Sequence, residues 1–113
     1  MPIYNKLVRD LIPQSIEAVE KKYVAYALDH EEFKNAILDK LIEEAVELKH
    51  AWSNDPDQRD TIVEELGDVY EALYYIREVL QISEDEIHLV RERKAIKKGR
   101  FDQRIFLYEV LED

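Results

Sequence analysis

Residues 41–70 read LIEEAVELKHAWSNDPDQRDTIVEELGDVY and carry the pattern from which we predict the fold. One pattern occurs twice in it, because the second Glu of a doublet is followed three residues later by another acid. On a helix, residues three apart lie on the same face, about one turn apart. Each copy therefore predicts two converging carboxylates. The pairs are Glu44 with Glu47 and Glu65 with Asp68.

The apolar residues around each pair place one Glu of the pair on the buried face of its helix. At about 100° per residue, Glu44 and Glu65 fall within the apolar stripes of their helices. A carboxylate on a buried face is costly unless a cation or hydrogen bonds compensate it. A bound divalent metal is the simplest compensation for several such groups, and oxygen-only ligands favour Mg²⁺ or Mn²⁺.

Between the two acidic pairs lies the clearest turn in the chain, residues 54–57 (NDPD). It separates two predicted helices, 30–53 and 58–81, the first of which opens on a capping box of Asp29 and Glu32. Two long helices joined by a short turn form an antiparallel hairpin. Because the acidic pairs lie about 10 residues before and after the turn, they are predicted side by side.

The rest of the chain predicts two further helices and an all-α, four-helix-type bundle. Asp10 is expected to cap a helix that runs to about Lys22. A capping box of Ser83 and Glu86 opens a helix over 84–98, with Gly99 at its end.

Two further segments, 23–28 and 105–111, are rich in β-forming residues. They predict a small two-stranded ribbon, and a last helix over 105–111 is the alternative.

Composition limits the class of protein. The 113 residues predict a single domain, 1–113, and 46% hydrophobic with 37% charged residues indicates a globular chain. A formal net charge of −10 disfavours a nucleic-acid polymer as partner. The chain has no cysteine and no long apolar run, so we expect a cytoplasmic protein without a membrane span.

Basic residues near both ends have two interpretations. Lys6 and Arg9 precede a helix start, where cations are unfavourable unless an anion binds. Lys94 and Lys98 lie near a helix end, where cations commonly interact with the helix dipole. Either set is ordinary solvated charge or a set of phosphate ligands.

Four segments carry a resemblance to a known family. They are YNKLVRDLIP (4–13), LIEEAVEL (41–48), VEELGDVYEAL (63–73) and KAIKKGRF (94–101). Together they resemble the all-α nucleoside triphosphate pyrophosphohydrolase superfamily, in its small MazG-like branch often labelled phosphoribosyl-ATP pyrophosphohydrolase-like. Arg100 departs from the branch, which usually has a second Gly there.

The resemblance implies Mg²⁺ bound by Glu44, Glu47, Glu65 and Asp68. It implies hydrolysis of a nucleoside triphosphate between the α and β phosphates, and assembly into a homodimer or homotetramer. Glu44 or Glu47 is then expected to orient or deprotonate the attacking water.

In this interpretation the basic residues hold phosphate oxygens: Lys6, Arg9, Lys94 and Lys98. Trp52 and Tyr70 are candidate surfaces for the base. The expected substrate is a non-standard or surplus nucleotide, in a house-cleaning role, and phosphoribosyl-ATP is the alternative. A non-catalytic module that binds a nucleotide or partner, and a structural helical protein with solvated acids, remain open.

Overall fold

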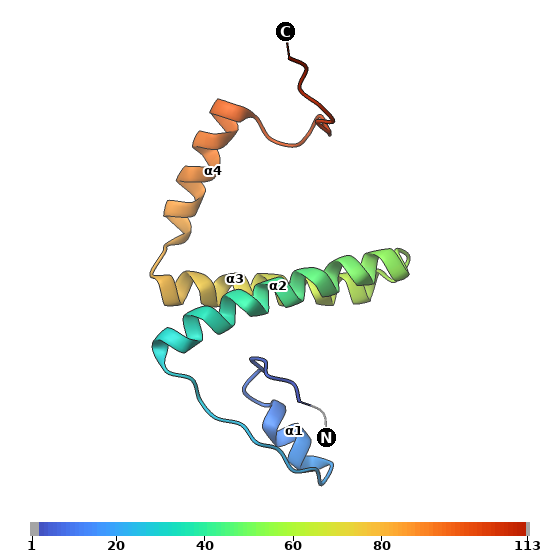
Figure 1. Cartoon of the computed structure of the whole chain (residues 1–113), viewed down its shortest axis with the longest axis vertical. Helices are drawn as coiled ribbons and strands as arrows, with labels where there is room; N and C mark the ends of the chain where they lie inside the picture. The colour runs from blue at the N-terminus through green and yellow to red at the C-terminus, as the bar shows by residue number, and fades with distance from the viewer. Residues whose placement is uncertain (1–2, 113) are drawn as a thin grey trace. The chain divides into compact units, whose positions relative to one another are not determined.

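The computed structural model describes residues 3–112 and is all-helical in that range, which confirms the predicted all-α class. It contains α1 (Ile12–Ala18), α2 (His30–Asn54), α3 (Arg59–Leu80) and α4 (Glu84–Lys98) (Figure 1). None of the helices in this range is both long enough and apolar enough to cross a membrane.

The hairpin of α2 and α3 is the centre of the fold, and the two helices lie side by side along their length (Figure 1). The predicted capping box opens α2: the Glu32 amide donates to the Asp29 carboxylate at 2.8 Å, and the Asp29 amide donates to Glu32 at 3.2 Å. Gln81 ends α3 in the left-handed conformation, at φ 56°. A capping box therefore marks the outer end of α2, and a left-handed residue ends α3.

The seam between α2 and α3 is narrow. Within the described residues, the buried hydrophobic side chains are Ile37 and Ala72, and the buried charged one is Glu44. A carboxylate therefore occupies one of the few positions that α2 and α3 shield from water.

Helix α1 is shorter than predicted. It begins after Leu11, whose side chain makes no capping hydrogen bond, so Asp10 is not the cap. It ends at Ala18 because Glu20 takes a left-handed conformation, at φ 60°, which a continuing helix does not allow.

The predicted ribbon of 23–28 with 105–111 is wrong for the described residues, since neither segment forms a strand or a helix. A β-forming composition yields a strand only where the backbone groups find a ladder partner. The segment at 23–28 instead connects α1 to α2, and the Tyr23 hydroxyl donates to Glu17 at 2.9 Å.

The chain divides into two compact units, one ending at Gln81 and the other beginning at Ile82. In the second unit, the Ser83 and Glu86 capping box forms as predicted, and Gly99 ends α4 with φ 81°. Organisation as a single domain stays a prediction.

Candidate metal centre on the helix hairpin

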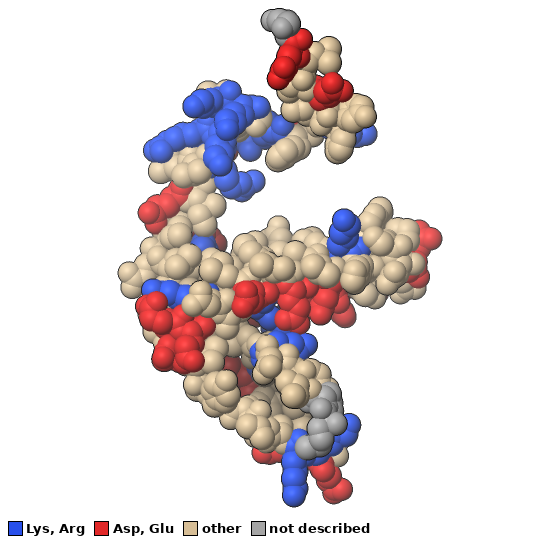
Figure 2. All heavy atoms as spheres, viewed as in Figure 1, with Lys and Arg blue, Asp and Glu red and all other residues tan. Residues whose placement is uncertain are grey.

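Three carboxylates from the hairpin meet at one place. Glu44 and Glu47 come from successive turns of α2 and Glu65 from α3, and one oxygen of each lies within 4.8 Å of the others. Figure 2 shows acidic side chains gathered along the lower side of the hairpin, whereas its opposite side is mostly tan in this view. The predicted meeting of the two acidic pairs therefore occurs for three of the four residues.

Two oxygens of this triad lack a hydrogen-bond partner. The Oε2 atoms of Glu44 and Glu65 are both buried and accept no hydrogen bond, and Glu44 as a whole is only 6% exposed. A buried acceptor without a donor is unfavourable by about 1–3 kcal/mol, and more when it is charged. Two carboxylates of the triad therefore each have one buried oxygen that lacks a hydrogen-bond donor or a cation to compensate it.

The electrostatics of the triad follow from this burial. Burial raises the pKa of Glu44, and the charges of Glu47 and Asp68 raise it further, whereas the hydrogen bond and charge of Lys40 act in the opposite direction. Burial also raises the pKa of Glu65, with added contributions from Glu47, Asp68 and Glu44. Both acids are therefore easier to protonate than free carboxyls.

Lys40 compensates part of the negative charge. Its Nζ lies 3.2 Å from Oε1 of Glu44 and 3.4 Å from Oε1 of Glu43. Lys6, from the N-terminal segment, contacts the same oxygen of Glu43 at 3.3 Å. Lys40 thus pairs with one oxygen of Glu44, and the other oxygen is buried without a hydrogen-bond partner.

Asp68 is the predicted ligand that the structure places outside the triad. Its Oδ1 accepts a hydrogen bond from Nη2 of Arg9 at 2.8 Å, and Nη1 of Arg9 donates to Glu71 at 3.2 Å. The hydrogen bond that Arg9 donates to Asp68 raises the pKa of Arg9. Arg9 and Lys6 therefore contact carboxylates at the edge of the site, and their role as phosphate ligands stays a prediction.

The other predicted phosphate ligands, Lys94 and Lys98, lie on α4 in the second compact unit. Their role also stays a prediction.

A cavity of about 290 Å³ adjoins the triad at Glu44. Its apolar part includes Phe33, Ile37, Ala72 and Tyr75, and the rings of Phe33 and Tyr75 meet edge to face at 6.5 Å. Charged side chains complete its lining: Arg9, Asp10, Lys40, Glu44, Asp68 and Glu71. The cavity therefore combines apolar and ring surface with charged groups, the combination typical of small-molecule sites.

Sequence reasoning missed these two rings. The predicted base-stacking residues, Trp52 and Tyr70, are 59% and 68% exposed and do not line this cavity. A usable signal was present, because Phe33 lies on the same apolar stripe of α2 as Ile37, four residues before it.

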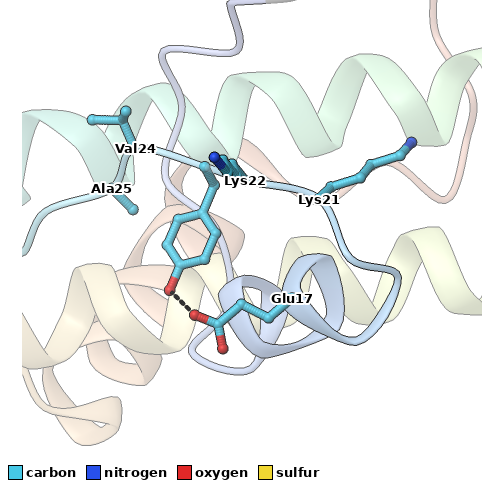
Figure 3. Close-up of a pocket in the computed structure, with 6 residues that line it drawn as sticks. Glu17, Lys21, Lys22, Val24 and Ala25 are labelled. Atoms are coloured by element: carbon cyan, nitrogen blue, oxygen red, sulfur yellow. Dashed lines mark hydrogen bonds between the residues drawn. The ribbon is translucent and has the colours of Figure 1, made fainter.

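A second, open hollow of about 610 Å³ lies beside α1 and is lined by Glu17 and residues 21–25 (Figure 3). The Glu17 carboxylate accepts the Tyr23 hydroxyl, which raises the pKa of Tyr23, and the Lys21 side chain extends away from that carboxylate. These groups form no cluster comparable to the triad.

In comparisons with protein-family models, with curated proteins and with solved structures, nothing matches this chain. The case for its function therefore rests on the sequence pattern and on the geometry described above.

Proposed function

We propose that this chain is a Mg²⁺-dependent nucleotide pyrophosphohydrolase, which hydrolyses a nucleoside triphosphate between the α and β phosphates to the monophosphate and pyrophosphate. The observation that carries the proposal is the triad of Glu44, Glu47 and Glu65, with two buried oxygens that have no partner. The resemblance of the four sequence segments supplies the reaction class.

The triad suits a hard divalent cation. All three groups are carboxylates, and oxygen-only donor sets select Mg²⁺, Mn²⁺ or Ca²⁺ over softer metals. Asp68 lies next to the triad and would complete a four-carboxylate set once it leaves Arg9. When bound, the metal neutralises phosphate charge and lowers the pKa of water.

Residues of the chain would accept the proton from water, orient the proton acceptor and bind the phosphates. Glu44, whose pKa is raised and whose Oε2 is unpartnered, is suited to accept a proton from water. Lys40 orients Glu44 through its other oxygen. Arg9 and Lys6 pair with partly exposed carboxylates at the edge of the site, and a phosphate group could replace these carboxylates as their partner.

The adjoining cavity supports a nucleoside as the rest of the substrate. Ile37 and Ala72, both nearly fully buried, provide apolar surface, and Phe33 and Tyr75 provide ring surface for a base. A non-standard or surplus nucleotide is the proposed substrate. Phosphoribosyl-ATP contains the same α–β bond and is the alternative.

The test is pyrophosphate release from a nucleotide panel by the purified chain, with and without Mg²⁺. Glu44→Gln should lower kcat by about 10²-fold or more, as expected when a proton acceptor is removed. Glu64→Gln is the matched control, because Glu64 is an exposed acid adjacent to the site residue Glu65. Release that is equal in both variants, or absent with every nucleotide and metal, would contradict the proposal.

A second candidate is a non-catalytic nucleotide-binding module. The ion pair of Arg9 with Asp68 favours it, because this pair occupies a carboxylate that would otherwise be available to bind the metal. This module would bind nucleotide in calorimetry with Mg²⁺ present and release no pyrophosphate. The same panel therefore separates the two candidates.

A further inference from the structure

Residues 6–10, which precede α1, lie against the acidic side of the hairpin and pair with acids of both its helices. Four of these residues, 7–10, line the cavity that adjoins Glu44, so the segment forms part of the cavity wall. We call residues 6–10 the strap. A segment in this place controls access to the cavity if it can leave the hairpin.

Ion pairs attach the strap to the hairpin. The Nζ of Lys6 lies 3.3 Å from Oε1 of Glu43 on α2. The guanidinium of Arg9 lies 2.8 Å from Asp68 and 3.2 Å from Glu71, both on α3. The side chains of Lys6 and Arg9 are 41% and 59% exposed. Exposed ion pairs are individually weak and respond to other charges nearby, so this attachment is reversible.

Little else holds the strap in place. Among the described residues, no backbone hydrogen bond joins residues 3–18 to α2 or α3. Helix α1, which follows the strap, has no buried residue, and Val8 within the strap is 38% exposed. The connection from α1 to α2 is also open to solvent, with Val24 98% exposed. The attachment therefore depends chiefly on the three ion pairs.

The acids that hold the strap are neighbours of the triad. Glu43 precedes Glu44 in the chain and shares Lys40 with it, at 3.4 Å and 3.2 Å. Asp68 follows Glu65 by three residues, and its charge raises the pKa of both Glu44 and Glu65. A divalent cation at the triad would therefore act on the same carboxylates that the strap uses.

We propose that the strap and a divalent cation compete for the acidic face of the hairpin, so that metal binding releases residues 6–10 and opens the cavity wall. The strap does not satisfy the triad, because the buried Oε2 atoms of Glu44 and Glu65 have no partner. A cation that compensates these oxygens repels the positive charges of the strap and attracts Asp68 away from Arg9. The strap thus covers the cavity until the metal has bound. This proposal rests on the metal binding of the proposed function and not on its hydrolytic step.

The test is limited trypsin digestion of the full chain, because trypsin cleaves after Lys and Arg and needs a detached, extended substrate. The bond after Lys6 lies in the strap. When opening is fast, cleavage tracks the population of the open form. Saturating Mg²⁺ should speed cleavage after Lys6 by about fivefold over NaCl at the same ionic strength, as expected when exposed ion pairs are lost. The bond after Arg104, in an exposed part of the second unit, is the internal control and should keep its rate.

A matched pair of variants tests the attachment without metal. Glu71→Gln removes one partner of Arg9 while it keeps the three triad carboxylates and every trypsin site. It should speed cleavage after Lys6 by about threefold, because the strap loses one exposed ion pair. Glu78→Gln is the control, since Glu78 is an exposed acid seven residues later on the same face of α3 and pairs with neither Lys6 nor Arg9. It should be cleaved as the wild type.

Calorimetric titration of the wild type with Mg²⁺ separates failure of this proposal from failure of the proposed function. Mg²⁺ binding with unchanged or slower cleavage after Lys6 overturns release of the strap and leaves the metal site intact. Absence of Mg²⁺ binding overturns the metal site and the release together. Equal cleavage of Glu71→Gln and Glu78→Gln shows that the Arg9 ion pair with Glu71 does not hold the strap, and it overturns the proposed attachment.

Discussion

The two faces of the helix hairpin are made by the same helices and have opposite chemistry. One face brings together Glu44, Glu47 and Glu65 with two unpartnered oxygens. The other exposes large apolar side chains, among them Ile42 on α2 and Tyr70 on α3. Both are unfavourable for an isolated chain, the first because like charges lie close together and the second because apolar surface meets water. The acidic face could hold a cation, so a response to Mg²⁺ should depend on this face and not on the apolar one.

The largest expected effect separates the two faces by their response to metal. With free Mg²⁺ at about 100 times its Kd, binding adds roughly 2.7 kcal/mol to the free energy of unfolding, or roughly 10 °C in Tm for a chain of this size. Glu65→Ala removes a triad ligand and should lose this gain. Thermal melts with and without Mg²⁺ measure it.

The control for that melt lies on the other face. Ile42→Ala removes apolar surface on the side of α2 opposite Glu44, so it should keep the full Mg²⁺ gain whatever it does to Tm itself. A wild type that does not respond to Mg²⁺, or an Ile42→Ala variant that loses the response, would contradict a metal site on the acidic face.

A smaller effect should appear with pH in the metal-free protein. The pKa values of Glu44 and Glu65 are raised above the ordinary value of 4.5 in the folded chain. Between that value and the raised pKa, the folded state therefore binds more protons than the unfolded state, and the free energy of unfolding increases as pH falls. Urea denaturation from about pH 7 down to about pH 5 should reveal this increase.

Glu65→Gln should flatten that profile, because the amide does not titrate, and it should also be more stable than the wild type near neutral pH. Glu64→Gln should retain the wild-type slope. A wild type whose stability falls steadily over the same pH range would mean that the triad is already compensated.

How much of the fold and of the candidate site can be predicted from the sequence depends on how many residues separate the interacting groups along the chain. The capping boxes at Asp29 and Ser83 join residues three apart, so the sequence alone identifies them. The triad was predictable because helical periodicity and one short turn determine where acids on two helices meet. Both signals act within one element or across one turn.

The interactions that escaped prediction join distant segments or depend on a partner strand. Arg9 reaches Asp68 across 59 residues, and no local pattern indicates that the N-terminal segment crosses the acidic face. The prediction of a two-stranded ribbon was wrong because residues 23–28 do not pair with a second strand. Trp52 is exposed although it continues the apolar stripe of α2, since it lies close to the turn where the hairpin ends.

The pairing of Arg9 with Asp68 and Glu71 gives the smallest prediction. These ion pairs are exposed, so Arg9→Gln should change the free energy of unfolding by less than about 1 kcal/mol. It should raise Mg²⁺ affinity by about fivefold, because it removes a positive charge beside the site and frees Asp68. If Arg9 also holds phosphate, the same variant should raise KM for the nucleotide.

Tighter Mg²⁺ binding together with a higher KM would identify Arg9 as a residue that alternates between carboxylate and phosphate partners. Lys34→Gln is the matched control, because Lys34 lies on α2 and pairs with Glu31 rather than with Asp68 or Glu71. Calorimetric titration with Mg²⁺ and steady-state kinetics measure the two shifts separately. Weaker Mg²⁺ binding by Arg9→Gln would instead mean that the Arg9 contact holds Asp68 in a position that favours the metal, and that the acidic face is already arranged for its cation.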